Sequence, residues 1–293
     1  MKKIVLLLIA TTLLACSSRE TKTSPSEEGK IDSGKLKIAL VLDGIGVHGF
    51  SGVGVLRILE KARIPLHLIV GNNMGALIGA LYAESQNSFS VEWDASQLEL
   101  SDYFSTSFFG GTSLAHASLE PFQRFIQKKI KRKKIEDLDV EFLSMTTNLR
   151  NGETFIFDKG DLNQAILASA AIPGFFNPQK MSGKILVTGS LTEGSGIRVA
   201  RQKNADIIIA LDTRTSLDFA PLNDQKDIIF QSHLISRNRE LTKDLEEADI
   251  IIQPALQKIK FNDFSKKREM MIAGQNATVE IIEKLSELIE NNK

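Results

Sequence analysis

Two glycine-rich turns, each set between a predicted strand and a predicted helix, constrain the fold of this chain more than any other feature. Continuous apolar runs predict buried strands at residues 37–43 and 66–70, and a turn follows each of them directly, at 44–49 and 71–75. A helix is predicted after each turn. Residues 53–64 carry an apolar stripe, and residues 76–84 place small side chains one turn apart. Strands that alternate with helices favour a parallel sheet with covered faces.

The rest of the chain continues this alternation without an internal repeat or domain boundary. Its composition is 42% hydrophobic and 25% charged, as in ordinary globular proteins. We therefore expect one α/β domain over residues 36–293, with a mostly parallel central sheet covered by helices on both faces. The further strands are predicted at 140–147, 153–157, 184–187, 206–212 and 249–253, and the further helices at 228–245 and 277–289.

The amino terminus has the pattern of an export signal followed by an anchor. Lys2 and Lys3 precede an apolar run at 4–15, which is too short to span a bilayer and has the length of a signal-peptide core. The run ends in Leu-Leu-Ala-Cys16, which resembles the lipobox of bacterial lipoproteins, where the cysteine receives lipid on its sulfur. We expect residues 1–15 to be a lipoprotein signal peptide and residues 16–35 to be the lipidated Cys16 with a polar, flexible tether. The alternative is an ordinary signal peptide with an incidental cysteine.

This interpretation places the protein in the bacterial cell envelope, anchored to the membrane through Cys16. Ser17, rather than Asp, follows the cysteine, so the inner-membrane retention signal of enteric lipoproteins is missing and the outer membrane is favoured. Lys and Arg total 36, equal to Asp and Glu, and without a basic excess we do not expect nucleic acid as a partner. The single cysteine and four histidines form no cluster, so we expect neither a metal nor a cofactor.

Several segments in the right order resemble the patatin-like phospholipase family. VLDGIGVHGFSGVGVLRILEKARI, at residues 41–64, is similar to the oxyanion loop and following helix of that family. IVGNNMGALIGALYA, at 69–83, is similar to its nucleophile elbow, and ASAAIPGFFNP, at 168–178, to the stretch before its catalytic aspartate. The resemblance implies a serine acyl hydrolase fold, in which a Ser–Asp dyad acts on lipid esters without a cofactor.

The chain departs from the family pattern at both dyad positions. Asn73 stands at the serine position, between Gly71 and Gly75, and Thr188 stands at the aspartate position. A carboxamide is a poor nucleophile, and a threonine hydroxyl cannot accept a proton as a carboxylate does. The oxyanion-loop positions also differ: bulky Ile45 replaces a glycine, and His48 replaces a basic residue. The loop positions are Gly44, Ile45, Gly46, His48 and Gly49.

Three functional hypotheses follow. The first is a lipid-anchored pseudoenzyme that retains an acyl-sized cleft at Asn73 and binds a phospholipid, a fatty acyl ligand or an envelope protein. The second is an active lipid acyl hydrolase, of the esterase or phospholipase A type, with Ser190 as relocated nucleophile and Asp43 as base. The third is a structural interaction protein whose cleft is filled by side chains such as Ile45.

Other polar and aromatic groups favour ordinary structural roles. His48, His67, His116 and His233 are scattered, and packing histidines are expected, although His48 is a candidate for lining the former site. The basic segment 128–134 suits a solvated helix end better than a contact with anionic lipid. Core packing is favoured over acyl contact for Phe104, Phe108 and Phe109.

Overall fold

The computed structural model describes residues 36–104, 117–193, 195–218, 222–256 and 259–292. The predicted signal peptide and tether at 1–35, with Cys16, lie outside the described residues. So do Phe108, Phe109 and His116.

An eight-stranded sheet forms the centre of the domain, in the order β5-β6-β3-β2-β1-β7-β8, with β4 paired to β3. The strands β3, β2, β1, β7 and β8 run parallel, while β4, β5 and β6 form an antiparallel end. The strands are β1 (Ile38–Leu42), β2 (Leu68–Gly71), β3 (Glu141–Asn148), β4 (Glu153–Phe157), β5 (Gln179–Met181), β6 (Lys184–Thr188), β7 (Ile207–Leu211) and β8 (Ile250–Ile252).

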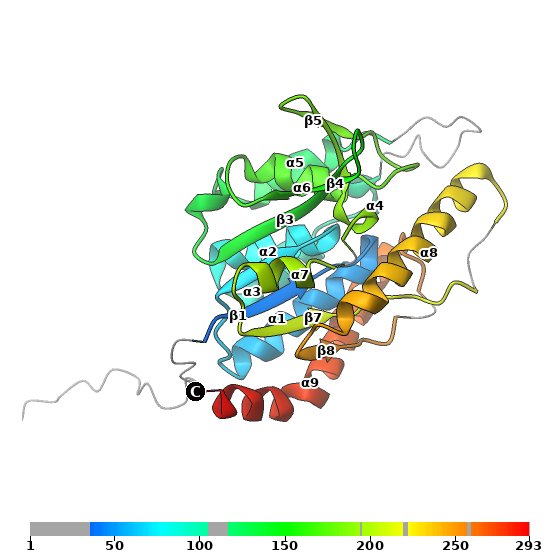
Figure 1. Ribbon diagram of the computed structural model, residues 1–293. Coiled ribbons are helices and arrows are strands. Elements are labelled where there is room, and N and C mark those ends of the chain that lie inside the picture. The colour runs from blue at the N-terminus through cyan, green and yellow to red at the C-terminus, as the bar shows by residue number, and fades with distance from the viewer. Residues whose placement is uncertain (1–35, 105–116, 194, 219–221, 257–258, 293) are drawn as a thin grey trace, which may run out of the picture. The chain divides into compact units, whose positions relative to one another are not determined.

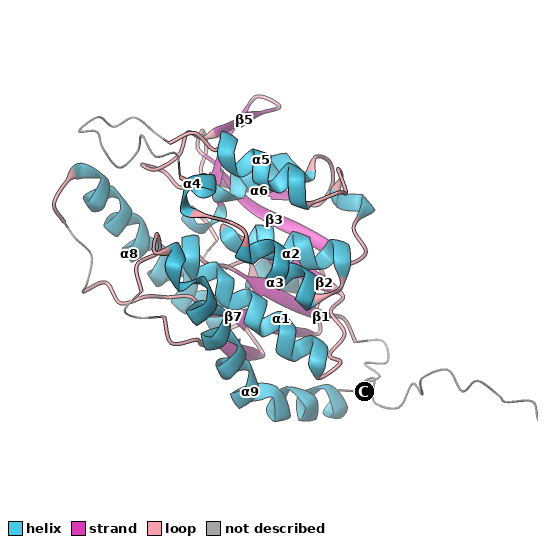
Figure 2. Ribbon diagram, turned by 180° about the vertical axis from the view of Figure 1, so that it is seen from behind, coloured by secondary structure: helices cyan, strands magenta, loops and turns pink. Residues whose placement is uncertain are grey.

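Helices cover both faces of this sheet, so the expected fold class is confirmed. Helices α7 and α8 lie on the face nearer the viewer in Figure 1, and α1, α2, α3 and α9 lie on the opposite face, seen in Figure 2. The α-helices are α1 (Ser51–Lys61), α2 (Met74–Ser85), α3 (Ser88–Ser96), α4 (Leu100–Tyr103), α5 (Glu120–Lys129), α6 (Leu162–Ala170), α7 (Ile197–Gln202), α8 (Gln225–Leu245) and α9 (Lys267–Asn291). Short 3-10 helices include η1 (Gly46–Phe50), η4 (Gly189–Leu191) and η5 (Phe264–Lys266).

Two hydrophobic clusters fill the space between the sheet and its helices. The larger contains Leu40, Phe50 and Leu77, and the smaller, under α7 and α8, contains Val41 and Leu241. Alternate residues of β1 point into opposite clusters, as the two-residue period of a strand requires. Both clusters draw their residues from 36–289, so the chain from residue 36 onward carries its own core.

Helices α1 and α9 cross at close range through a glycine on each of them. A Cβ atom at Gly54 would overlap the carbonyl oxygen of Met271, and one at Gly274 would overlap that of Ser51. The contact therefore depends on the missing side chains. Within the part of the chain that the structure describes, no helix is both long and apolar enough to cross a membrane.

Candidate functional site

The turn from β2 into α2 holds Asn73 in a strained backbone conformation. Its φ of 52° and ψ of −128° lie outside the left-handed helical region that non-glycine residues sometimes adopt. Strain of this kind costs about 1–3 kcal/mol and persists only where the surroundings enforce it. The surroundings here are tight, because a Cβ atom at Gly75 would overlap the carbonyl oxygen of Leu42, and one at Gly71 would lie 2.6 Å from Ala76 Cα. The turn thus has the sharp geometry of an elbow, with an amide at its apex.

The side chain of Asn73 joins Thr188 to Asp43. The Thr188 hydroxyl donates to Asn73 Oδ1 over 3.0 Å, and Asn73 Nδ2 donates to Asp43 Oδ1 over 3.0 Å. Thr188 ends β6, and Asp43 follows β1, so the three side chains reach one point from separate strands. The structure therefore brings together the two positions at which the sequence predicts a replaced dyad.

A second amide, that of Asn72, stabilises this arrangement through further hydrogen bonds. Its Oδ1 accepts from the backbone N–H groups of Asn73 and Gly189, at 3.1 and 3.2 Å. The hydroxyl of Ser169 also donates to it over 3.3 Å, and Thr188 Oγ1 lies at the same distance from it. Such a network of buried hydrogen bonds makes the elbow rigid.

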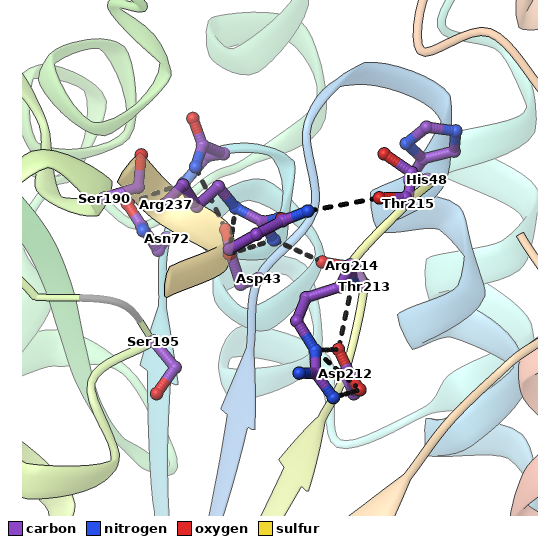
Figure 3. A network of polar contacts seen from close by, with 12 residues as sticks. Asp43, His48, Asn72, Ser190, Ser195, Asp212, Thr213, Arg214, Thr215 and Arg237 are labelled. Atoms are coloured by element: carbon purple, nitrogen blue, oxygen red, sulfur yellow. Dashed lines mark hydrogen bonds and ion pairs between the residues drawn. The ribbon is translucent and has the colours of Figure 1, made fainter. Parts of the chain in front are cut away.

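Arg237 of α8 neutralises the carboxylate that contacts Asn73 (Figure 3). Its Nε and one terminal nitrogen lie 3.0 and 2.6 Å from Asp43 Oδ2, and both side chains are almost fully buried. The same terminal nitrogen donates to Thr213 Oγ1 over 2.6 Å. Both oxygens of Asp43 thus already accept hydrogen bonds, from Asn73 and from Arg237, so Asp43 is poorly placed to act as a base.

The loop after Asp43 is covered by a segment near the carboxyl end of the chain. The backbone N–H of Val47 donates to the carbonyl oxygen of Phe261 over 2.7 Å, and that of His48 donates to Ile45 over 3.2 Å. The Ile45 side chain is 2% exposed and belongs to the larger core cluster. These two N–H groups already have acceptors, so neither is free to bind an oxyanion.

His48 cannot replace the positive charge that the family pattern expects at its position. Its Nε2 donates to the carbonyl oxygen of Ile259 over 2.7 Å. Burial lowers the pKa of His48 to about 4, although the hydrogen bond to Ile259 by itself raises this pKa. The ring is therefore neutral at pH 7, and it acts as a link between the loop and the covering segment.

Ser190, the candidate relocated nucleophile, lies beside a histidine rather than beside Asp43. Its Oγ is 3.2 Å from His233 Nε2 and 3.0 Å from Thr188 Oγ1. Burial and the nearby Arg237 lower the pKa of His233 to about 4, so the ring is neutral and could accept a proton at pH 7. Its Nδ1 has no hydrogen-bond partner among the described residues, so no carboxylate orients the ring.

The whole constellation is shut off from solvent. Asp43, Asn73 and Thr188 are 0% exposed, and Ser190 is 1% exposed. The sequence predicts an acyl-sized cleft at Asn73, but in the structure Asn73 is buried among the side chains that contact it. A substrate carbonyl could reach Asn73 only if the surrounding segments moved apart.

The sequence gives no sign that Arg237 belongs to the site, and it predicts a packing role for His233. Both come from α8, where they lie one turn apart and point at the elbow. The signal available in the sequence was a histidine and an arginine four residues apart on the buried side of a predicted helix. Nothing local identified their partners, which are distant in the chain.

The remaining candidates take structural roles where the structure describes them. His67 Nδ1 accepts from the backbone N–H of Ile38 over 3.1 Å. Phe104 is 1% exposed and stacks on Phe176 with ring centroids 5.1 Å apart, which is core packing. In the basic segment, Lys129 ends α5 and pairs with Asp94 over 2.9 Å.

An elbow between strand and helix, beside a glycine loop on the neighbouring strand, defines the class of α/β acyl hydrolase folds. The family model of patatin-like phospholipases matches residues 40–201. That span covers more than half of the chain, and the protein belongs to the patatin-like phospholipase family.

Similar proteins carry the same domain within much longer chains. Patatin-like phospholipase domain-containing protein 6 of Homo sapiens is 31% identical over 188 residues, covering 60% of this chain and 13% of that protein. Lysophospholipase NTE1 of Debaryomyces hansenii is 31% identical over 198 residues, covering 64% of this chain and 12% of that protein. This chain thus corresponds to a small part of these relatives.

A solved structure supports the fold. VipD from Legionella pneumophila aligns with a TM-score of 0.53 at 12% identity, covering 85% of this chain and 67% of that chain. At this identity the likeness concerns the fold alone.

Proposed function

We propose that this protein is a catalytically inactive member of the patatin-like phospholipase family. It is held in the bacterial cell envelope by lipid on Cys16 and acts by binding a lipid or a protein partner. The former catalytic centre serves as a structural joint between β1, β2, β6 and α8.

One observation carries the proposed inactivity: the 3.0 Å hydrogen bond between Thr188 and Asn73, at positions that are 0% exposed. An amide nitrogen shares its lone pair with the carbonyl group, so Asn73 cannot attack an ester at a useful rate. Thr188 uses its only proton in a neutral hydrogen bond and offers no base. The carboxylate within reach, Asp43, is bound to Arg237.

Hydrolysis of short- and long-chain esters by residues 36–293 tests this proposal. We expect no ester hydrolysis by the wild-type domain. Asn73→Ser/Thr188→Asp restores the family dyad on the existing elbow and is the matched comparison. If only the double variant hydrolyses esters, the missing dyad explains the inactivity of the wild type. If neither protein hydrolyses esters, the burial of the site is a second cause. Wild-type hydrolysis that survives rigorous purification and is abolished by a mutation in the site would overturn the proposal.

A second candidate function is acyl hydrolysis through Ser190, favoured by its 3.2 Å contact with His233 Nε2. A neutral imidazole at this distance is able to take the hydroxyl proton during attack. The burial of Ser190 weighs against this candidate, and so does the lack of a partner for His233 Nδ1 among the residues that the structure describes. If it holds, Ser190→Ala abolishes ester hydrolysis, whereas Ser286→Ala on α9 leaves it intact.

A further inference from the structure

Helix α3 exposes two aromatic side chains one turn apart. Phe89 is 74% exposed and Trp93, the single tryptophan of the chain, is 65% exposed. Ile272 on the neighbouring helix α9 is 47% exposed. Large apolar side chains that gather on one surface mark a binding face more often than an ordinary surface. Helices α1, α3 and α9 lie on the same side of the sheet (Figure 2).

Two adjoining cavities connect these exposed groups. One, of about 240 Å³, lies between α1 and α9, and its walls include Val53, Arg57 and Ile272. The other, of about 310 Å³, lies between α3 and α9 beside Phe89 and Trp93. Glu92, Arg268 and Met271 line both cavities. We call this surface the α1–α3–α9 face.

Among the described residues, the charges on the α1–α3–α9 face leave one arginine side chain without a partner. Glu92 is paired with Arg57 over 3.1 Å. Around it, Glu99 is paired with Lys267 and Glu269 with Lys266, both over 2.8 Å. The Arg268 side chain makes no ion pair or hydrogen bond with any residue that the structure describes. It therefore presents a free guanidinium between the two cavities, where it is available to an anionic group from outside the domain.

We propose that the α1–α3–α9 face docks on a phospholipid membrane that contains anionic lipid. Phe89, Trp93 and Ile272 enter the interfacial layer, where the amphipathic ring of Trp93 is favoured and the two apolar side chains are buried. Arg268 binds a lipid phosphate, which the planar guanidinium contacts through two parallel hydrogen bonds. The adjoining cavities receive the glycerol and upper acyl part of the bound lipid.

The envelope role of this docking rests on the proposed function, in which Cys16 holds the domain at a membrane. The twenty residues 16–35 would then keep the domain close to the bilayer surface. The α1–α3–α9 face lies outside the group of buried side chains around Asn73. Membrane docking is therefore independent of whether the domain hydrolyses esters.

Fluorescence of Trp93 tests the proposal directly, because no other tryptophan contributes to the signal. Unlipidated residues 36–293, which carry the whole described core, are mixed with vesicles of equal parts phosphatidylcholine and phosphatidylglycerol. A parallel sample receives vesicles of phosphatidylcholine alone. We expect a blue shift of the emission and co-sedimentation with the mixed vesicles, and weaker binding to phosphatidylcholine.

Three variants separate the contributions of the apolar side chains and of Arg268 to vesicle binding. Phe89→Ser/Ile272→Ser should weaken binding to both kinds of vesicle at least tenfold, on the order expected for losing two large apolar contacts. Arg268→Gln should weaken binding to the mixed vesicles only. Leu149→Ser, at a residue 48% exposed after β3, is the matched control and should bind like the wild type. Circular dichroism checks that each variant is folded.

The proposal is overturned if the emission of Trp93 shows no blue shift with either kind of vesicle. In that case a protein is the expected partner of the α1–α3–α9 face. It is equally overturned if Phe89→Ser/Ile272→Ser and Arg268→Gln both bind the mixed vesicles as tightly as the wild type. Neither result bears on catalytic inactivity or on Cys16, because the assay involves neither hydrolysis nor the lipid anchor.

Discussion

The hydroxyl of Thr188 lies 3.0 Å from the amide oxygen of Asn73, although β6 and the β2–α2 elbow that carry them are distant in the chain. The contact has the length of an ordinary O–H···O hydrogen bond. Its chemistry differs from that of a Ser–Asp dyad, because an amide accepts and a hydroxyl donates, and neither group is charged. The two predicted dyad positions are therefore joined by a neutral hydrogen bond.

Thr188→Val should destabilise the domain. The substitution keeps the shape of the side chain but leaves Asn73 Oδ1 without its donor in a fully buried position. We expect a loss of about 1–3 kcal/mol in the free energy of unfolding, measured by urea denaturation. Thr215→Val is the control, since the Thr215 side chain makes no hydrogen bond with the described residues and should change stability little. Equal stability of the two variants would show that the Thr188 contact contributes nothing.

Arg237→Met should destabilise the domain more strongly. It leaves the Asp43 carboxylate buried without its counter-charge, a change that typically costs about 3–5 kcal/mol. Arg239→Met, at an exposed position of the same helix, is the control and should change stability by less than about 0.5 kcal/mol.

Removing the partner charge as well should restore part of the loss. Arg237→Met/Asp43→Asn carries no unpaired ion, so we expect it to be more stable than Arg237→Met alone. If the double variant is no more stable than the single variant, the buried charge is not the cause of the destabilisation.

Stability should fall as the pH falls from about 6.5 toward 4. Burial lowers the pKa values of both His48 and His233 to about 4, below the value near 6.5 of an unfolded chain. In that window the unfolded state binds more protons than the folded state, so each histidine removes up to about 1.4 kcal/mol per pH unit. Urea denaturation at several pH values measures the slope. His48→Gln and His233→Gln should each reduce it, and an unchanged slope would contradict the buried, neutral state of the rings.

Gly274→Ala should destabilise the domain, although alanine is the better helix former by about 1 kcal/mol. The new methyl group would overlap the carbonyl oxygen of Ser51 and push α9 away from α1. We expect a net loss of about 1–3 kcal/mol by thermal unfolding. Asn276→Ala, at an exposed position of the same helix, should instead be neutral or slightly stabilising, because alanine also has the higher helix propensity there. A stabilised Gly274→Ala variant would mean that the α1–α9 contact adjusts freely.

The central strands β1, β2, β3 and β7 could be predicted well from the sequence, because they are buried on both faces and appear as largely continuous apolar runs. The prediction at 37–43 matches β1, Ile38–Leu42, and that at 153–157 matches β4. The short strand β5, Gln179–Met181, was missed because it is partly exposed and has no apolar run. Helix α9 begins at Lys267 rather than at 277, because its first turns bury Met270 and Met271 among polar residues that obscure the stripe.

The site could be predicted only in part. The glycines around residue 73 indicated an elbow, because its local backbone geometry demands glycine at fixed positions. The resemblance to the patatin-like family then assigned Asn73 and Thr188 to the dyad positions. The burial of the site could not be predicted, since it depends on Arg237 and His233 from α8 and on Phe261 over the oxyanion loop. Contacts between segments that are distant in the chain leave no periodic signal in either segment.

The most direct measurement of the central claim is fluorophosphonate labelling of the purified wild-type domain, followed by peptide mass spectrometry. Such reagents form a covalent bond with an activated serine hydroxyl. The proposed inactivity predicts no labelled serine, while Asn73→Ser/Thr188→Asp, assayed in parallel, shows whether residue 73 can be reached at all. Stoichiometric labelling of Ser190 in the wild type, lost in His233→Gln, would contradict the claim and identify an active acyl hydrolase.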